Sequence, residues 1–176
     1  ITLCLGVAVR RAVLAASGIE LELKWVNDLI YNTRKISGIL VEVPVTSAGS
    51  QKGSNLVVGV GINLNRPAEE LPEDIKNKAI FLNEISGTHE DPAELCFQFE
   101  EVYNQLKKDN CELLLDEWRA YSCTLGQEVS ATSGDIKGTA IDIDTSGALI
   151  VKTDRGNKLV HAGEISVRSA DGSYSY

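Results

Sequence analysis

The 176-residue sequence lacks the patterns that mark metal sites and disulfide frameworks. Its four cysteines include no CxxC pair, and neither histidine has a partner at the spacing of metal ligands. Most of the cysteines lie in apolar or amphipathic runs, where cysteine behaves as a small hydrophobic residue. We therefore expect reduced thiols in a cytoplasmic protein, no metal ligands from side chains, and no catalytic role for His89 or His161.

The sequence also lacks a membrane-spanning run and a basic stripe. Arg10 and Arg11 interrupt the apolar opening, and no basic residue precedes it, so it does not resemble a signal peptide. The net charge is −8, and residues 1–65 are the only third with an excess of basic residues, six against four acidic. These features argue against membrane and nucleic-acid partners, and they favour a small anionic ligand in the first third.

What the sequence does contain predicts an α+β fold, with mostly antiparallel strands packed against helices. A helix is expected over residues 2–17 because its apolar residues follow helical spacing, and Gly18 suits a C-terminal cap. Short connections between apolar runs predict an antiparallel meander. Five short strands then suggest a small β-barrel, with a boundary near Thr124 that gives domains 1–124 and 125–176. The predicted meander strands are 21–25, 37–43 and 56–64, and the loop formers Asn27, Asp28 and Asn32 predict a loop in the run VNDLIYNTRK between the first two. The predicted later helices are a short one closed by Gly87, one beginning at Pro92, and one around 111–121 with Leu113, Leu114 and Trp118 as core candidates.

Three segments carry candidate chemistry. Lys24 ends a half-buried strand and would present a cation to a cleft, although an isolated strand lysine is usually a solvated surface residue. Gly38, in the run RKISGILVE, permits close backbone approach, but it also fits a bulge in an ordinary core strand. Gly59, Gly61 and Asn63 fall on one face of a strand, where the glycines leave room for a flat ligand or for close helix packing.

The sequence resembles the biotin–protein ligases in four motifs taken in order: KWVNDL, RKISGILVE, GVGINLN and a C-terminal run ending EISVRS. The resemblance covers nearly the whole chain, and the ordered combination is far more specific than any single motif. It implies a biotin/lipoate ligase-like catalytic fold followed by an SH3-like barrel. It also implies activation of biotin by ATP, with Mg²⁺, to biotinyl-5'-AMP, and transfer of biotin to a lysine of a biotin carboxyl carrier protein.

The resemblance also assigns roles to individual residues. Lys24 matches the family's catalytic lysine, which contacts the biotin carboxylate and the α-phosphate. The residues that match positions near the biotin or the nucleotide are Leu29, Gly38, Gly59, Gly61, Ile62, Asn63, Lys137 and Arg168, the last two by looser transfer from the barrel.

The sequence departs from the family pattern at two points. Val26 stands where the pattern has proline, so the backbone there is less restricted. The glycine- and arginine-rich loop and a biotin-binding strand, which we expect before residue 1, have no counterpart in the sequence. The sequence also has no counterpart of the DNA-binding winged helix that some family members carry, so we expect no repressor role. The isolated chain is therefore either part of an active ligase, a nucleotide- or biotin-binding scaffold, or a partner subunit; a homodimer is also compatible with the family.

Overall fold

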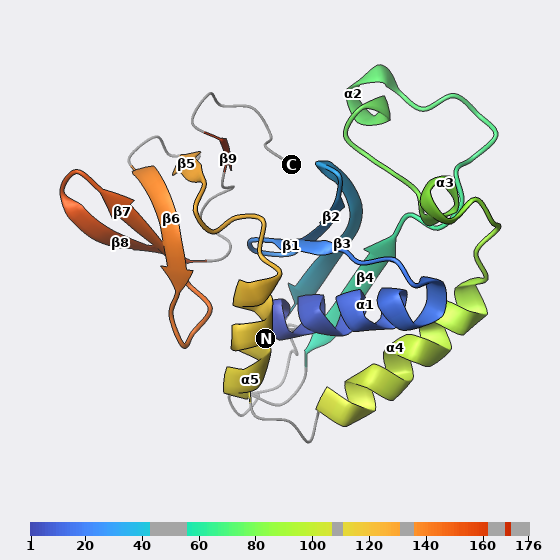
Figure 1. The fold of residues 1–176 in the computed structure, drawn as a ribbon, viewed down its shortest axis with the longest axis horizontal. Coiled ribbons are helices and arrows are strands. Elements are labelled where there is room, and N and C mark those ends of the chain that lie inside the picture. Colours follow the sequence, from blue (N-terminus) through green and yellow to red (C-terminus); the bar gives the residue numbers. More distant parts are fainter. Residues whose placement is uncertain (43–55, 107–110, 131–135, 162–167, 170–176) are drawn as a thin grey trace, which may run out of the picture.

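The computed structural model describes residues 1–42, 56–106, 111–130, 136–161 and 168–169. Two antiparallel sheets make up its framework, and helices cover one face of the first sheet (Figure 1). The first sheet has the strand order β1-β2-β3-β4, and the second has the order β8-β7-β6-β5-β9. The α+β class expected from the sequence is therefore confirmed.

Helix α1 (Thr2–Ser17) forms the centre of the hydrophobic core. Val7, Val9 and Val13 are fully buried, because α1 packs against the first sheet on one side and against α4 and α5 on the others. Gly18 ends the helix in the left-handed conformation at φ 73°, and its N–H donates to Leu14 O. The helix has the predicted bounds, and Gly18 has the predicted capping role.

The first sheet contains one more strand than the sequence predicted. Its strands are β1 (Glu22–Lys24), β2 (Asp28–Tyr31), β3 (Arg34–Glu42) and β4 (Val57–Ile62). The segment around β2 was expected to be a loop because of Asn27, Asp28 and Asn32. That expectation is wrong, since Asn32 and Thr33 both take positive φ angles, 45° and 68°, and close a two-residue hairpin between β2 and β3.

The remaining helices follow the strands of the first sheet. The predicted short helix and two later helices are confirmed as α3 (Leu82–Ser86), α4 (Pro92–Leu106) and α5 (Cys111–Ala120), whereas α2 (Glu73–Lys76) was not foreseen. Leu114 and Trp118 of α5 are buried, but Leu113 is exposed, so its assignment to the core was wrong. None of the helices in the described ranges combines the length and apolar character needed to cross a membrane.

The second sheet follows Thr124. Its strands are β5 (Glu128–Ser130), β6 (Lys137–Ile143), β7 (Leu149–Thr153), β8 (Gly156–Val160) and β9 (Arg168–Ser169). The five predicted strands are present, but no pairing between β8 and β9 closes a barrel within the described residues. The division into domains at Thr124 stays a prediction, and the two sheets contact each other across it.

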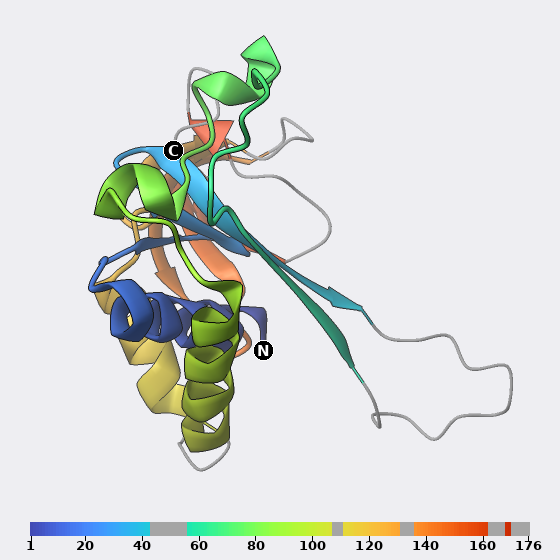
Figure 2. The ribbon, with the colours of Figure 1, turned by 90° about the vertical axis from the view of Figure 1, so that its right-hand side faces the viewer.

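The β3–β4 hairpin extends beyond the helical layer (Figure 2). Strand β4 lies at the edge of the first sheet, and its apolar residues Val57 and Val58 are exposed there. Leu40 of β3, which pairs with Gly59, is also exposed. An uncovered, uncharged edge strand can pair with another strand. The first sheet is therefore open on the side away from β1.

Two leucines on opposite faces of this sheet provide a matched stability test. Leu29 is 0% exposed, so Leu29→Ala should lower the free energy of unfolding by about 2–5 kcal/mol. Leu40 is 58% exposed, and Leu40→Ala should change it by less than about 1 kcal/mol. Urea unfolding, with the same m value for both variants, measures these two changes. Equal losses of unfolding free energy in Leu29→Ala and Leu40→Ala would contradict this assignment of faces.

Candidate active site

The strand register of the first sheet aligns the predicted site residues in one row. Lys24 pairs with Asp28, Asp28 pairs with Gly38, and Gly38 pairs with Gly61. Directly paired residues share a face of an antiparallel sheet. This face, opposite the buried Leu29, therefore carries a lysine, a carboxylate and two stretches of bare backbone side by side.

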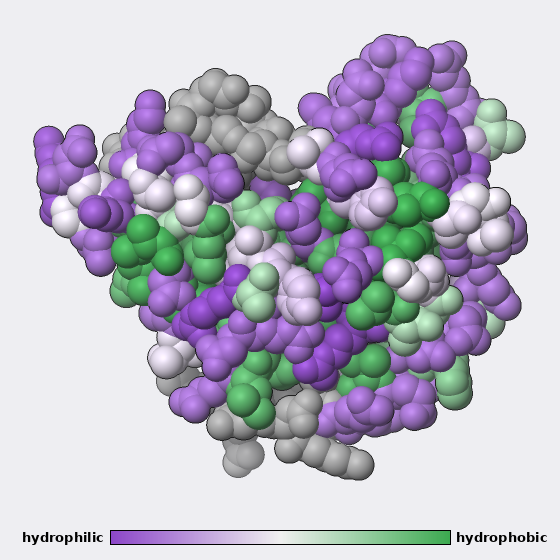
Figure 3. Space-filling view, viewed as in Figure 1, coloured by the Kyte–Doolittle hydropathy of each residue, from purple (hydrophilic) through white to green (hydrophobic). Residues whose placement is uncertain are grey.

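A groove of about 650 Å³ adjoins this row, where the ends of β2, β3 and β4 face the segment around α2. In the space-filling view the surface is hollowed beside the largely hydrophilic α2 region (Figure 3). This volume lies within the usual range for small-molecule sites. The groove is lined by Asp28, Lys35, Ile36, Ser37, Gly38, Gly61, Ile62, Asn63, Asp74, Ile75, Lys78 and Ala79.

The two glycines form a floor without side chains. A Cβ atom built on Gly61 would meet no atom closer than 3.9 Å, so the glycine is not required by packing within the protein. A Cβ atom on Gly38 would lie 3.0 Å from Lys35 Nζ, which is the mobile end of a side chain. The floor therefore leaves room at Gly61 for a molecule that is not part of this chain, whereas the Lys35 side chain lies over Gly38.

Two acidic and two basic side chains line the groove, and one acidic and one basic residue among them form an ion pair. Lys35 Nζ lies 2.6 Å from Asp28 Oδ1, and both residues line the groove together with Asp74 and Lys78. Lys24 lies next to Asp28 in the row but is only 7% exposed. Burial lowers the pKa of the Lys24 amine, and the Asp28 carboxylate opposes that effect by raising it.

Asn63 is held at the end of β4 by its own side chain. Its Nδ2 group donates to Lys35 O at 3.3 Å and to Ile80 O at 3.1 Å, and its backbone N–H donates to Ile36 O. These bonds tie β3 to the chain that returns from α2. Asn63 therefore fixes one wall of the groove.

The thiol of Cys123 lies near Lys24 on the other side. Its Sγ donates to Leu23 O at 3.6 Å, and burial raises the pKa of the thiol to about 11. Cys123 is therefore protonated at neutral pH and adds no charge beside Lys24.

The structure brings some of the predicted site residues together and not others. Gly38, Gly61, Ile62 and Asn63 line the groove, and Lys24 adjoins them in the row. Leu29 is buried on the opposite face, because residues next to each other in a strand point to opposite sides of a sheet. Gly59, two residues from Gly61, is not among the residues that line the groove, and it pairs with Leu40 of β3.

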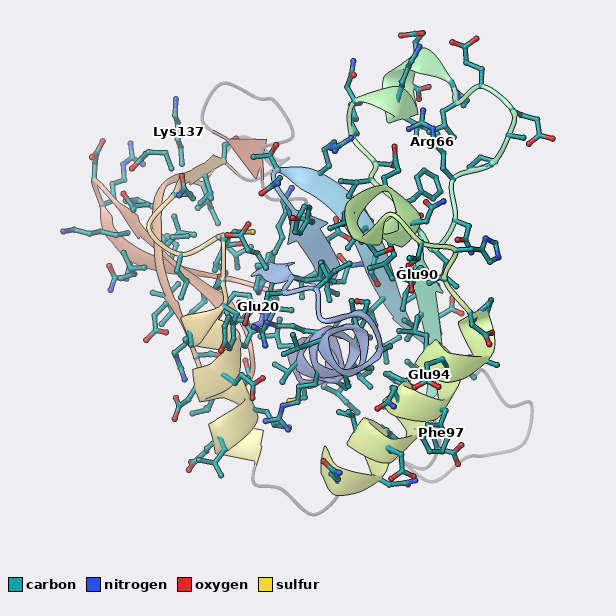
Figure 4. All side chains as sticks on the ribbon, turned by 45° about the vertical axis from the view of Figure 1, so that its right-hand side comes forward. Glu20, Arg66, Glu90, Glu94, Phe97 and Lys137 are labelled. Carbon is teal, nitrogen blue, oxygen red and sulfur yellow. The ribbon has the colours of Figure 1, made fainter. Side chains whose placement is uncertain are left out.

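Of the two site candidates in the second sheet, Lys137 is not among the residues that line the groove. Lys137 is exposed and projects toward the end of the molecule where α2 lies (Figure 4). Arg168 and Lys137 both pair with Ser130 and so occupy one row of the second sheet. The side chain of Arg168 lies outside the described part of the chain.

The sequence interpretation left out four charged residues of the groove. Asp28 and Lys35 belong to the quoted motifs KWVNDL and RKISGILVE, which would have been sufficient to select them. Asp74 and Lys78 come from the stretch around α2, which carries no recognisable motif. Asp74 and Lys78 are recognised as groove residues only in the structure, where the segment around α2 faces the ends of β2, β3 and β4.

Comparisons with known proteins identify the family of this chain. Residues 1–63 match the Biotin/lipoate A/B protein ligase family, and residues 124–168 match the Biotin protein ligase C terminal domain. The biotin protein ligase of Aquifex aeolicus superposes with a TM-score of 0.80 at 30% identity, over 96% of this chain and 74% of that one. The chain belongs to the biotin protein ligase family.

Two curated members of the biotin protein ligase family extend the comparison. The bifunctional ligase/repressor BirA of Bacillus spizizenii is 30% identical over 95% of this chain and 52% of its own length. The biotin–[acetyl-CoA-carboxylase] ligase of Paracoccus denitrificans is 31% identical over 83% of this chain and 62% of its own length. This chain thus spans about half the length of the first of these relatives.

The position of Lys24 beside Asp28 generates a test of the site's electrostatics. Asp28→Asn should lower the pKa of Lys24 further, because it removes the carboxylate that stabilises the ammonium form. In the unmutated protein the folded-state pKa already lies below that of the unfolded chain. Burial of the charged ammonium therefore lowers the free energy of unfolding at neutral pH. This destabilisation decreases as the pH rises through the lowered folded-state pKa.

NMR titration of the Lys24 ε-methylene group measures this pKa directly. Glu20→Gln is the control, since Glu20 is an exposed carboxylate just before β1 (Figure 4). An unchanged or higher pKa of Lys24 in Asp28→Asn would contradict the arrangement described above.

Proposed function

We propose that this chain carries the nucleotide- and biotin-binding face of an ATP-dependent biotin–protein ligase. The observation that carries the proposal is the row of Lys24, Asp28, Gly38 and Gly61 beside the groove. It combines a cation for anionic groups with a bare floor on which a planar ring can lie. A structure of the Aquifex aeolicus ligase in complex with biotin and ATP, 30% identical to this chain, is consistent with these ligands.

The residues present fit the two substrates. The groove volume suits a small molecule, and the glycine floor would be filled by any side chain larger than hydrogen. Lys35 and Lys78 line the groove and suit phosphate oxygens. Mg²⁺ would arrive with ATP and screen its phosphates, since no group of three His, Cys, Asp or Glu residues in the described ranges is arranged to bind a metal.

The proposed reaction has two steps. An oxygen of the biotin carboxylate attacks the α-phosphorus of ATP, which forms the mixed anhydride biotinyl-5'-AMP and releases pyrophosphate. A lysine amine of the biotin carboxyl carrier protein then attacks the biotinyl carbonyl, loses a proton, and displaces AMP. Lys24 would hold the carboxylate and the α-phosphate together by placing its positive charge between two negative groups.

Removal of the Lys24 charge tests the proposed catalytic role. In the full-length protein that contains this sequence, Lys24→Ala should slow biotin-dependent ATP–pyrophosphate exchange more than about a hundredfold, which corresponds to about 3 kcal/mol. The control is Lys158→Ala, which removes an exposed lysine of β8. Near-normal exchange in a folded Lys24→Ala protein would refute the assignment.

The glycine floor provides a second test with a matched control. Gly61→Ala should weaken biotin or ATP binding at least about tenfold, because its methyl group would occupy the floor of the groove. Gly59→Ala lies two residues away on the same strand, outside the groove lining, and should leave both affinities unchanged. Thermal unfolding should show similar small changes for both variants, since neither Cβ atom meets an atom closer than 3.9 Å.

Two measurements on the 176-residue chain distinguish an active ligase from a binding scaffold. They are calorimetric titration with biotin and with ATP, and biotin-dependent ATP–pyrophosphate exchange on the same sample. Binding without exchange would favour a binding scaffold for the isolated chain. Equal affinities in Gly61→Ala and Gly59→Ala would contradict the proposed floor.

A further inference from the structure

Strand β1, which carries Lys24, is bonded along its outer edge to the segment that connects the two sheets. Leu23 N–H donates to Tyr121 O at 2.8 Å, and Cys123 N–H donates to Leu23 O at 3.0 Å. Leu23 and Ser122 accordingly form a parallel bridge. The residue before Lys24 is therefore fixed by the connecting segment on one side and by β2 on the other.

The residue after Lys24 is fixed by two further bonds. Trp25 N–H donates to Thr124 Oγ1 at 2.8 Å, and Trp25 Nε1–H donates to Gly147 O at 3.0 Å. Trp25 and Thr124 are 4% and 5% exposed, so water cannot easily replace either bond. Trp25 is thus attached both to the connecting segment and to the turn between β6 and β7.

Both partners of Trp25 are themselves held in place. The backbone N–H of Thr124 donates to Ser122 Oγ, and Thr124 O accepts from Gln127 N–H. Gly147 takes a positive φ of 86° in a turn closed by its N–H bond to Asp144 O. The bonds to Trp25 therefore transmit the position of the second sheet to the backbone on either side of Lys24.

We propose that Thr124 and the Trp25 indole are positioning residues, which set the place of the Lys24 ammonium by docking the second sheet onto β1. The inference rests on the proposed catalytic role of Lys24. A lysine side chain has many rotamers, and a misplacement of about 1 Å can slow a reaction about a hundredfold. β1 has only three residues and pairs with β2 up to Lys24, so the backbone after Lys24 depends on the bonds of Trp25.

The test compares two substitutions of one hydroxyl in the full-length protein. Thr124→Val keeps the shape of the side chain but removes the acceptor for Trp25 N–H, whereas Thr124→Ser keeps the acceptor. We expect Thr124→Val to lower kcat for biotin-dependent ATP–pyrophosphate exchange about tenfold, with KM for biotin and ATP changed less than about threefold. In the separate variant Thr124→Ser, kcat should stay within about twofold of the unmutated value.

Arg119→Gln serves as the control for loss of sheet docking in general. Arg119 Nε donates to Asp142 Oδ1 at 2.7 Å and its NH2 group donates to Ile143 O at 2.8 Å, so it binds the second sheet without touching β1. This variant should lower the Tm and leave kcat unchanged. A kcat loss in Arg119→Gln equal to that in Thr124→Val would overturn the inference, because simple docking would then explain both.

A readout independent of activity is the pKa of Lys24, followed by NMR titration. It should move toward the ordinary lysine value in Thr124→Val, as the ammonium becomes more exposed, and stay unchanged in Thr124→Ser and Arg119→Gln. If Thr124→Val does not fold, Trp25→Phe replaces it; this change removes the bond to Gly147 O together with part of the buried indole ring. Unchanged kcat and pKa in the folded variant would disprove the positioning role, whereas normal exchange in Lys24→Ala would instead disprove the proposed function.

Discussion

The cross-strand register of the first sheet is the constraint on which the site depends. Lys24, Asp28, Gly38 and Gly61 lie on four different strands, and they share one face because each strand pairs in this register. A shift of one residue would turn Lys24 toward the helices and expose Leu23 and Leu29. The burial of those leucines against α1 therefore keeps the lysine and the glycines on the open face.

The two sheets are coupled mainly through α5 and the segment that follows it. Arg11 of α1 pairs with Glu117, and the Arg10 guanidinium lies 3.2 Å from the ring centre of Tyr121. Arg119, on the same helix, binds Asp142 of the second sheet. Helix α5 thus connects the core helix to the second sheet, and the bonds that hold β1 come from the segment after α5. Changes in the second sheet can therefore reach Lys24 through a short, hydrogen-bonded path.

The open side of the first sheet contrasts with this tightly held side. β1 has its edge covered by the connecting segment, whereas β4 exposes uncharged apolar residues along its edge. Next to β1, the peptide bond between Trp25 and Val26 is cis. The family pattern has proline in place of Val26, and cis peptide bonds usually precede proline. The groove lies between these two sides, at the ends of β2, β3 and β4.

Local sequence determined most of the elements and the identity of several site residues. The spacing of apolar residues and the cap at Gly18 defined α1, and the motifs around Lys24, Gly38 and Gly61 indicated the correct family. The loop predicted in the run 26–35 was wrong at Asp28–Tyr31, which forms β2, because turn-forming residues look the same in sequence whether or not the flanking residues pair.

Only the tertiary structure decided which of these residues meet. It placed Leu29 in the core, left Gly59 outside the groove, and brought Asp74 and Lys78 to it from a segment without a motif. It also joined Trp25 to Thr124 and Gly147, 99 and 122 residues away. The reason is physical: motifs and periodicity report local conformation and the inward face of an element, whereas strand register and sheet docking are set by contacts between distant segments.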